Sequence, residues 1–105
     1  MSRQLKAVLV IFRSCSELQI KALPFVDVRS HEIDWDTIFR QDFGSGHTAA
    51  VRWAYTIWCG GYAPGRDPFL NSLAMDDSVV CAVLAALRIW WQVRTPPSDM
   101  MEDRP

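Results

Sequence analysis

Four side chains that could bind a hard metal ion or transfer protons lie close together near residue 33. They are one imidazole, His31, and three carboxylates, Glu32, Asp34 and Asp36. Carboxylate oxygens are the ligands that Ca²⁺ and Mg²⁺ prefer, and an imidazole beside a carboxylate can act as a general base. The spacing matches no metal-ligand pattern, however, and the acids stand where a helix would begin. We therefore interpret the segment as a helix start and predict no metal and no cofactor.

The chain also holds the residue types for a nucleophilic thiol. There are three cysteines, Cys15, Cys59 and Cys81, and two histidines, His31 and His47. A catalytic thiol needs an imidazole base beside it and an acid that orients the imidazole. The sequence has no nucleophile-elbow motif; Cys59 is expected at a helix end, partly exposed, and Cys81 in the core or at an interface. We predict that the protein is not an enzyme, with a small enzyme dependent on Cys59 as an alternative.

Two glycines, Gly44 and Gly46, flank Ser45 directly before a predicted helix. The free N–H groups at a helix N-terminus can bind a phosphate or a carboxylate. A lone pair of glycines without a preceding strand is also typical of a tight turn between two helices. We favour the turn over an anion site.

Aromatic and guanidinium side chains occur together in the second half of the chain, as Arg52 with Trp58 and as Arg88 with Trp90 and Trp91. Such groups make cation–π contacts or anchor protein interfaces. Adjacent residues point about 100° apart on a helix, so a small domain would have difficulty covering both Trp90 and Trp91. Uncovered aromatic surface predicts an interface.

Aspartates at two predicted helix starts and in one loop add negative charge to this surface. They could imitate nucleic-acid phosphates toward a basic groove of a partner, in which case binding would weaken steeply with salt. The predicted partner-binding residues are Trp35, Asp34, Asp36, Asp42, Arg52, Trp58, Asp76, Asp77, Arg88 and Trp91.

Direct binding of nucleic acid is an alternative that depends on a basic N-terminal hairpin. Its positive side chains would be Arg3, Lys6, Arg13, Lys21 and Arg29. Useful affinity needs about six phosphate contacts, and the net charge of the chain is −1. We therefore disfavour nucleic acid as the partner.

The first part of the chain is predicted to be extended. Residues 6–12 are a continuous apolar run rich in β-branched side chains, and residues 17–22 alternate between polar and apolar. Residues 13–16 would be the hairpin turn, and residues 25–29 resume the extended pattern. Apolar residues of the first segment also fit helical spacing, so a helix over residues 3–13 is the alternative.

From residue 34 the period of the apolar residues becomes helical. Asp34 is expected to cap a helix over residues 35–43. A second helix is expected over residues 47–59, with Gly60 as its C-terminal cap. A short helical turn is expected within residues 68–75.

Residues 78–93 predict a helix that is apolar almost all the way round and therefore nearly fully buried. The predicted fold class is α+β, with an N-terminal antiparallel β-hairpin or small sheet packed on three or four helices. An all-α fold is the alternative. Residues 1–94 are expected to form a single globular domain and residues 95–105 a disordered acidic tail.

Composition limits the class of protein. Half of the 105 residues are hydrophobic, which predicts a folded globule, and three cysteines with no C-x-x-C spacing disfavour a disulfide framework or a zinc site. The longest apolar helix would span only about 22 Å, too short for a membrane. We predict a small cytoplasmic protein-interaction module that binds itself, as a homo-oligomer, or a larger complex. Phage and mobile-element accessory proteins that inhibit host defence or nucleic-acid-handling complexes include chains of this kind.

Overall fold

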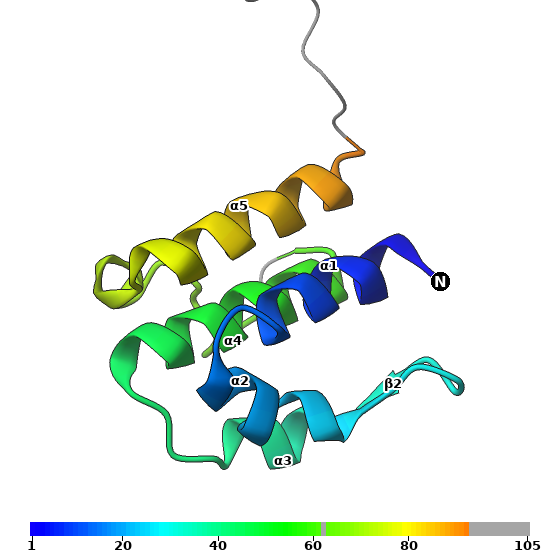
Figure 1. Cartoon of the computed structure of the whole chain (residues 1–105), viewed down its shortest axis with the longest axis horizontal. Coiled ribbons are helices and arrows are strands. Elements are labelled where there is room, and N and C mark those ends of the chain that lie inside the picture. Colours follow the sequence, from blue (N-terminus) through cyan, green and yellow to red (C-terminus); the bar gives the residue numbers. More distant parts are fainter. Residues whose placement is uncertain (62, 93–105) are drawn as a thin grey trace, which may run out of the picture.

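The fold is helical with one small β-hairpin, in three layers (Figure 1). The structure is a computed structural model that describes residues 1–61 and 63–92. The described elements are α1 (Arg3–Phe12), α2 (Ser16–Lys21), the 3₁₀ turn η1 (Leu23–Phe25), β1 (Val26–Asp27), β2 (Glu32–Ile33), α3 (Trp35–Phe39), α4 (Ser45–Cys59), the 3₁₀ turn η2 (Ser72–Ala74) and α5 (Asp77–Trp90). The predicted acidic tail, residues 95–105, lies outside the described residues.

Helices α1 and α4 form the middle layer, with α5 on one side and α2 and α3 on the other (Figure 1). Helix α1 contacts both α4 and α5, so it stands at the centre of the core. The fully buried side chains come mainly from α1, α4 and α5 and include Leu5, Val8, Ile11, Phe12, Leu18, Ile38, Val51 and Val79. Burial of these apolar side chains is the main stabilising contribution to the fold.

The prediction of a strand over residues 6–12 is wrong, and the alternative helix over residues 3–13 is correct. Helix α1 begins at a Ser2 cap, whose hydroxyl accepts the N–H of Leu5 at 3.1 Å. The polar residues Arg3, Lys6 and Arg13 are all exposed, at a spacing that puts them on one helical face. Packing against two helices therefore overrides the β preference of the branched side chains.

The prediction of a strand over residues 17–22 is also wrong. The segment forms α2, where Leu18 and the capping residue Ala22 are buried one helical turn apart while Ile20 is 70% exposed. The antiparallel hairpin occurs later in the chain, where Val26 pairs with Ile33 and Asp27 with Glu32. The carboxylate of Asp27 accepts the N–H groups of the turn, a common arrangement for an Asp at this position.

Helices do follow residue 34, but the first is shorter than expected: α3 ends at Phe39 rather than at residue 43, whereas α4 covers the second predicted helix. Asp34 caps α3 by accepting the N–H of Thr37 at 3.1 Å. Helix α4 ends at Gly60, whose φ of 76° lies in the left-handed region that glycine adopts without strain. The short helical turn expected within residues 68–75 is η2.

Helix α5 forms where expected, but the prediction that it is nearly fully buried is wrong. Only Val79, Val83 and Ala86 are buried, and Cys81, expected in the core or at an interface, is exposed. The physical reason is that α5 is an outer layer, covered only on the side that faces α1 and α4 (Figure 1). Of the helices that the structure describes, none is both long and apolar enough to cross a bilayer.

Asp76 should be the residue on which the start of α5 depends. Its Oδ1 accepts the N–H of Val79 at 3.0 Å and the hydroxyl of Ser78 at 2.8 Å, and these hydrogen bonds lower the pKa of Asp76. Asp76→Ala leaves the N–H of Val79 without this partner, and we expect the melting temperature at pH 7 to fall by a few degrees. Asp76→Asn, which keeps an acceptor oxygen, should stay closer to the native protein.

The carboxylate of Asp76 should also make the stability of the fold depend on pH. Because the pKa of Asp76 is lower in the folded protein than in the unfolded chain, its contribution is present above the unfolded value, near pH 4, and is lost as the pH falls through the folded value. Thermal unfolding at pH 7 and pH 3 checks both expectations. Equal losses for the Ala variant at both pH values would contradict the role of the charge.

Candidate functional site

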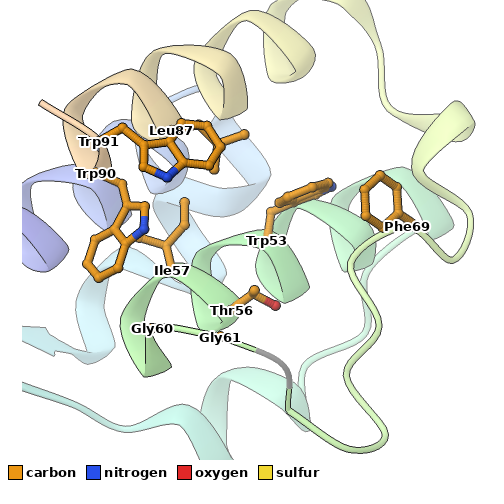
Figure 2. A pocket seen from close by; sticks show the side chains of 9 residues that line it. All are labelled: Trp53, Thr56, Ile57, Gly60, Gly61, Phe69, Leu87, Trp90 and Trp91. Carbon is orange, nitrogen blue, oxygen red and sulfur yellow. The ribbon is translucent and has the colours of Figure 1, made fainter. Parts of the chain in front are cut away.

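An exposed apolar groove lies between α4, α5 and the loop that leads to η2. Two adjoining hollows of about 300 and 350 Å³ share Trp53, Phe69 and Leu87 as walls (Figure 2). We call this surface the apolar groove. Its apolar lining side chains are Trp53, Ile57, Phe69, Leu73, Met75, Val80, Val83, Leu84, Leu87, Trp90 and Trp91.

Local packing holds the walls of the groove in place. The ring of Trp53, on α4, meets the ring of Phe69 edge-on, with the centroids 4.9 Å apart. At the other end, Gly60 and Gly61 lie below Trp90 (Figure 2). A β-carbon on Gly60 would lie 3.8 Å from the indole of Trp90, so the end of α4 lies close beneath this side chain.

The outer rim of the groove consists of large apolar side chains that are strongly exposed to solvent. Leu73 is 100% exposed, Phe69 70%, Trp91 64% and Leu84 55%. All four are large apolar side chains that line one continuous surface. Patches of this kind commonly mark binding sites.

The predicted partner-binding residues do not lie on one surface. Asp77, Arg88 and Trp91 share the exposed face of α5, next to the groove. Trp35 and Trp58 lie on the other side of α4, in a half-buried aromatic cluster with ring centroids 6.4 Å apart. Trp91 is therefore the indole of this set that is most open to a partner.

The aromatic cluster around Trp35 serves mainly to join α1, α3 and α4. The Trp35 ring centroid lies 5.9 Å from that of Phe12 and 4.9 Å from that of Tyr55. The ring of Trp58 lies 5.2 Å from the imidazole of His31, beside a small hollow that Gln4 also lines. Edge-on and tilted aromatic packing of this kind stabilises a core boundary.

The predicted acidic residues divide between opposite sides of the molecule. Asp34 and Asp36 lie at the start of α3, whereas Asp76 and Asp77 lie at the start of α5, beyond the middle layer (Figure 1). Asp42 is exposed in the loop between α3 and α4. Helix capping accounts for Asp34 and Asp76, and no common acidic face joins these two helix starts.

Arg52, another predicted partner-binding residue, lies half-buried on α4. Its Nη1 is buried and has no hydrogen-bond partner among residues 1–61 and 63–92, and the same holds for the indole nitrogen of Trp53. These polar atoms lie on the helix that forms one wall of the apolar groove.

The basic N-terminal residues do not form the hairpin on which nucleic-acid binding depended. Arg3 donates to the carbonyl of Trp90, which ties α1 to the end of α5. Lys21 donates to Glu17 and to the carbonyl of Asp42. Within the described part of the chain, no three or more His, Cys, Asp or Glu side chains are arranged so that they could hold a metal ion.

The structure also changes the expected pairing of thiol and imidazole. All three cysteines are free, and Cys59 is exposed. A side-chain hydrogen bond between Cys59 and Tyr55 raises the pKa of Tyr55. The cysteine close to an imidazole is instead Cys15, whose Sγ lies 3.6 Å from Nε2 of His47. Thirty-two residues separate the two, so no local motif in the sequence could have linked them.

No protein-family model, curated protein or solved structure matches this chain.

Proposed function

We propose that the protein is a non-enzymatic interaction module of the cytoplasm and that its first partner is a second copy of itself, bound through the apolar groove and the exposed face of α5. The observation that carries the proposal is a continuous exposed stripe along that helix. Three free cysteines fit a reducing compartment.

The stripe has the spacing of a helix–helix contact. Its residues are Asp77, Cys81, Leu84, Arg88 and Trp91, all exposed. The steps between them are four, three, four and three residues, which place them within a sector of about 80° around the helix. This alternation of threes and fours is the spacing by which one helix packs along another. Helix α5 therefore presents a second packing face in addition to the one it buries.

The exposed apolar area is large enough to hold two copies together. If a fully exposed large side chain presents about 150 to 250 Å², the exposed parts of Phe69, Leu73, Leu84 and Trp91 amount to roughly 430 to 720 Å². That range reaches or exceeds the upper half of the largest apolar patch on typical monomers, about 300 to 600 Å². It is also most of the roughly 800 Å² that each partner contributes to a standard interface.

The charges on α5 favour an antiparallel arrangement of the two copies. Asp77 lies in the first turn and Arg88 in the last turn of the helix. The two are eleven residues apart, about 16 Å along the helix axis. A two-fold axis on the exposed face between Cys81 and Leu84 would bring each Asp77 beside the Arg88 of the other copy and would oppose the two helix dipoles.

The test is the mass of the protein in solution and its change on Leu84→Glu. By sedimentation equilibrium at about 100 µM, the native chain should have twice its mass of 12.0 kDa. A glutamate at position 84 would carry a charge into the contact, and we expect the dissociation constant to rise at least tenfold, about 1.4 kcal/mol. A native chain that stays at 12.0 kDa, or a dimer indifferent to Leu84→Glu, would overturn the proposal.

Ile20→Glu is the matched control, because Ile20 is 70% exposed on α2, on the opposite side of the molecule from α5. It should leave the dissociation constant unchanged. Salt supplies a second control: an apolar contact should weaken little between 0.1 and 0.5 M NaCl, whereas a contact built on aspartates should weaken strongly.

A further inference from the structure

Outside the apolar groove, a thiol, an imidazole and a carboxylate meet in one chain of contacts. Nδ1 of His47, on α4, lies 2.6 Å from Oε1 of Glu17, on α2. Nε2 of the same ring lies 3.6 Å from Sγ of Cys15, the residue directly before α2. His47, near the start of α4, thus contacts both Glu17 on α2 and Cys15 at the N-terminal cap of α2.

The carboxylate determines which nitrogen of His47 holds the proton. The hydrogen bond from His47 is the largest cause that lowers the pKa of Glu17, so this group is ionised at neutral pH. An ionised carboxylate can only accept hydrogen bonds, so Nδ1 must be the donor. In the neutral ring Nε2 then has a free lone pair directed at Sγ of Cys15, where it can accept the thiol proton.

Neighbouring charges hold this arrangement in place. Lys21 lies 3.3 Å from Oε2 of Glu17, so each carboxylate oxygen has its own partner. Asp76, at the start of α5, lies within electrostatic range of His47. The charged groups that face His47 are thus two carboxylates and, behind Glu17, one ammonium.

The cluster is open enough for a small reagent. The side chain of His47 is 27% exposed and that of Glu17 is 32% exposed, and Cys15 is half-buried beside them. Cys59 and Cys81 are more exposed than Cys15. Accessibility alone would make Cys15 the slowest of the three thiols.

We propose that Cys15 is a nucleophilic thiol activated by His47, with Glu17 as the positioning residue, and that it exchanges with small-molecule disulfides. His47 takes the proton of Cys15, and the thiolate attacks one sulfur of the disulfide. The S–S bond of the reagent breaks, a mixed disulfide forms on Cys15, and the departing thiolate takes the proton from His47. Cys15 is oxidised and the departing sulfur is reduced.

Disulfide exchange is the reaction that these three groups can perform by themselves. It requires a thiolate and a proton donor for the departing sulfur, and both are present. Acyl transfer would need, in addition, hydrogen-bond donors placed for an oxyanion. Cys15 does not line the apolar groove, so the site and the proposed self-association can be tested separately.

The experiment is exchange with oxidised glutathione at pH 7, followed at each cysteine by peptide mass spectrometry. In the native chain we expect Cys15 to form the mixed disulfide at least about tenfold faster than Cys59, against the order of exposure; Cys59 is the reference thiol because Cys81 lies on the face proposed to bind a second copy. His47→Gln should lower the rate at Cys15 at least tenfold and leave the other two rates unchanged. His31→Gln is the matched control and should change none of the three.

Two further measurements separate activation from a simple loss of structure. In 6 M guanidinium chloride the advantage of Cys15 should disappear, because the imidazole no longer lies beside it. In the folded protein, ¹⁵N chemical shifts should show the proton of neutral His47 on Nδ1, and Glu17→Ala should redistribute it to Nε2 while lowering the rate at Cys15. Equal rates at Cys15 and Cys59 of the native chain, or no effect of His47→Gln, would overturn the proposal.

Discussion

Gly46→Ala should lower the free energy of unfolding by about 3 kcal/mol, because the site has no room for a methyl group. A β-carbon at this position would lie 2.8 Å from the carbonyl carbon of Ala74 and closer still to its oxygen. Both are backbone atoms of η2, which cannot rotate away as a side chain can. The turn would have to move away from α4, with loss of the contacts that hold it. Urea unfolding followed by circular dichroism measures the change.

Gly44→Ala is the matched control, two residues away at the N-terminal cap of the same helix. A β-carbon there would meet no atom within 4 Å. Its effect should stay within about 1 kcal/mol, since the weaker cap is partly offset by the smaller conformational freedom of the unfolded chain. If the two variants were equally stable, the close approach of η2 to α4 would be wrong.

The sequence identified this pair of glycines but not the reason for Gly46. The glycines favour a tight turn between two helices, but the link from α3 to α4 spans residues 40–44, and Gly46 lies within the first turn of α4. The requirement for glycine comes instead from a backbone segment 28 residues later in the chain. No local pattern could indicate such a contact, because it depends on how a distant turn packs.

The sequence predicted best where local chemistry decides the structure. Asp34 and Asp76 cap helices, and Gly60 ends one, because each satisfies hydrogen bonds or backbone angles within a few residues. The first helix was missed because its branched apolar residues prefer strands in isolation, and only contact with two other helices reverses that preference. The exposed, regularly spaced Arg3 and Lys6 were the available sign of a helix.

The candidate site was predictable only in part. Trp91, Arg88 and Asp77 were selected from the sequence, and the structure places them together on the exposed face of α5. The walls contributed by Phe69 and Leu73 were missed, since a loop and a single 3₁₀ turn are too short to carry a periodic signal. The pairing of Cys15 with His47 joins residues from α4 and the link before α2, so it needed the fold itself.

Phe12→Ala should produce the other large loss of stability, about 3 to 5 kcal/mol. Phe12 is fully buried at the end of α1, where its ring meets the indole of Trp35 edge-on. The substitution removes most of an aromatic side chain and leaves a cavity at the junction of α1 with the Trp35 cluster. Since small domains are stable by only about 5 to 15 kcal/mol, the variant should unfold at much lower urea concentration and, at the upper limit, be partly unfolded without denaturant.

Two comparisons separate lost packing from other effects of this substitution. Phe12→Leu keeps an apolar side chain of similar reach and should lose less than half as much stability. Leu73→Ala removes a side chain that is 100% exposed, so its free energy of unfolding should stay within about 0.5 kcal/mol of the native value. A Phe12→Ala variant as stable as Leu73→Ala would contradict the position of α1 at the centre of the core.

Because Leu73 lines the apolar groove, the Leu73→Ala substitution should still weaken self-association. Loss of binding without loss of folding stability is the result expected where an exposed apolar side chain serves an interface rather than the core.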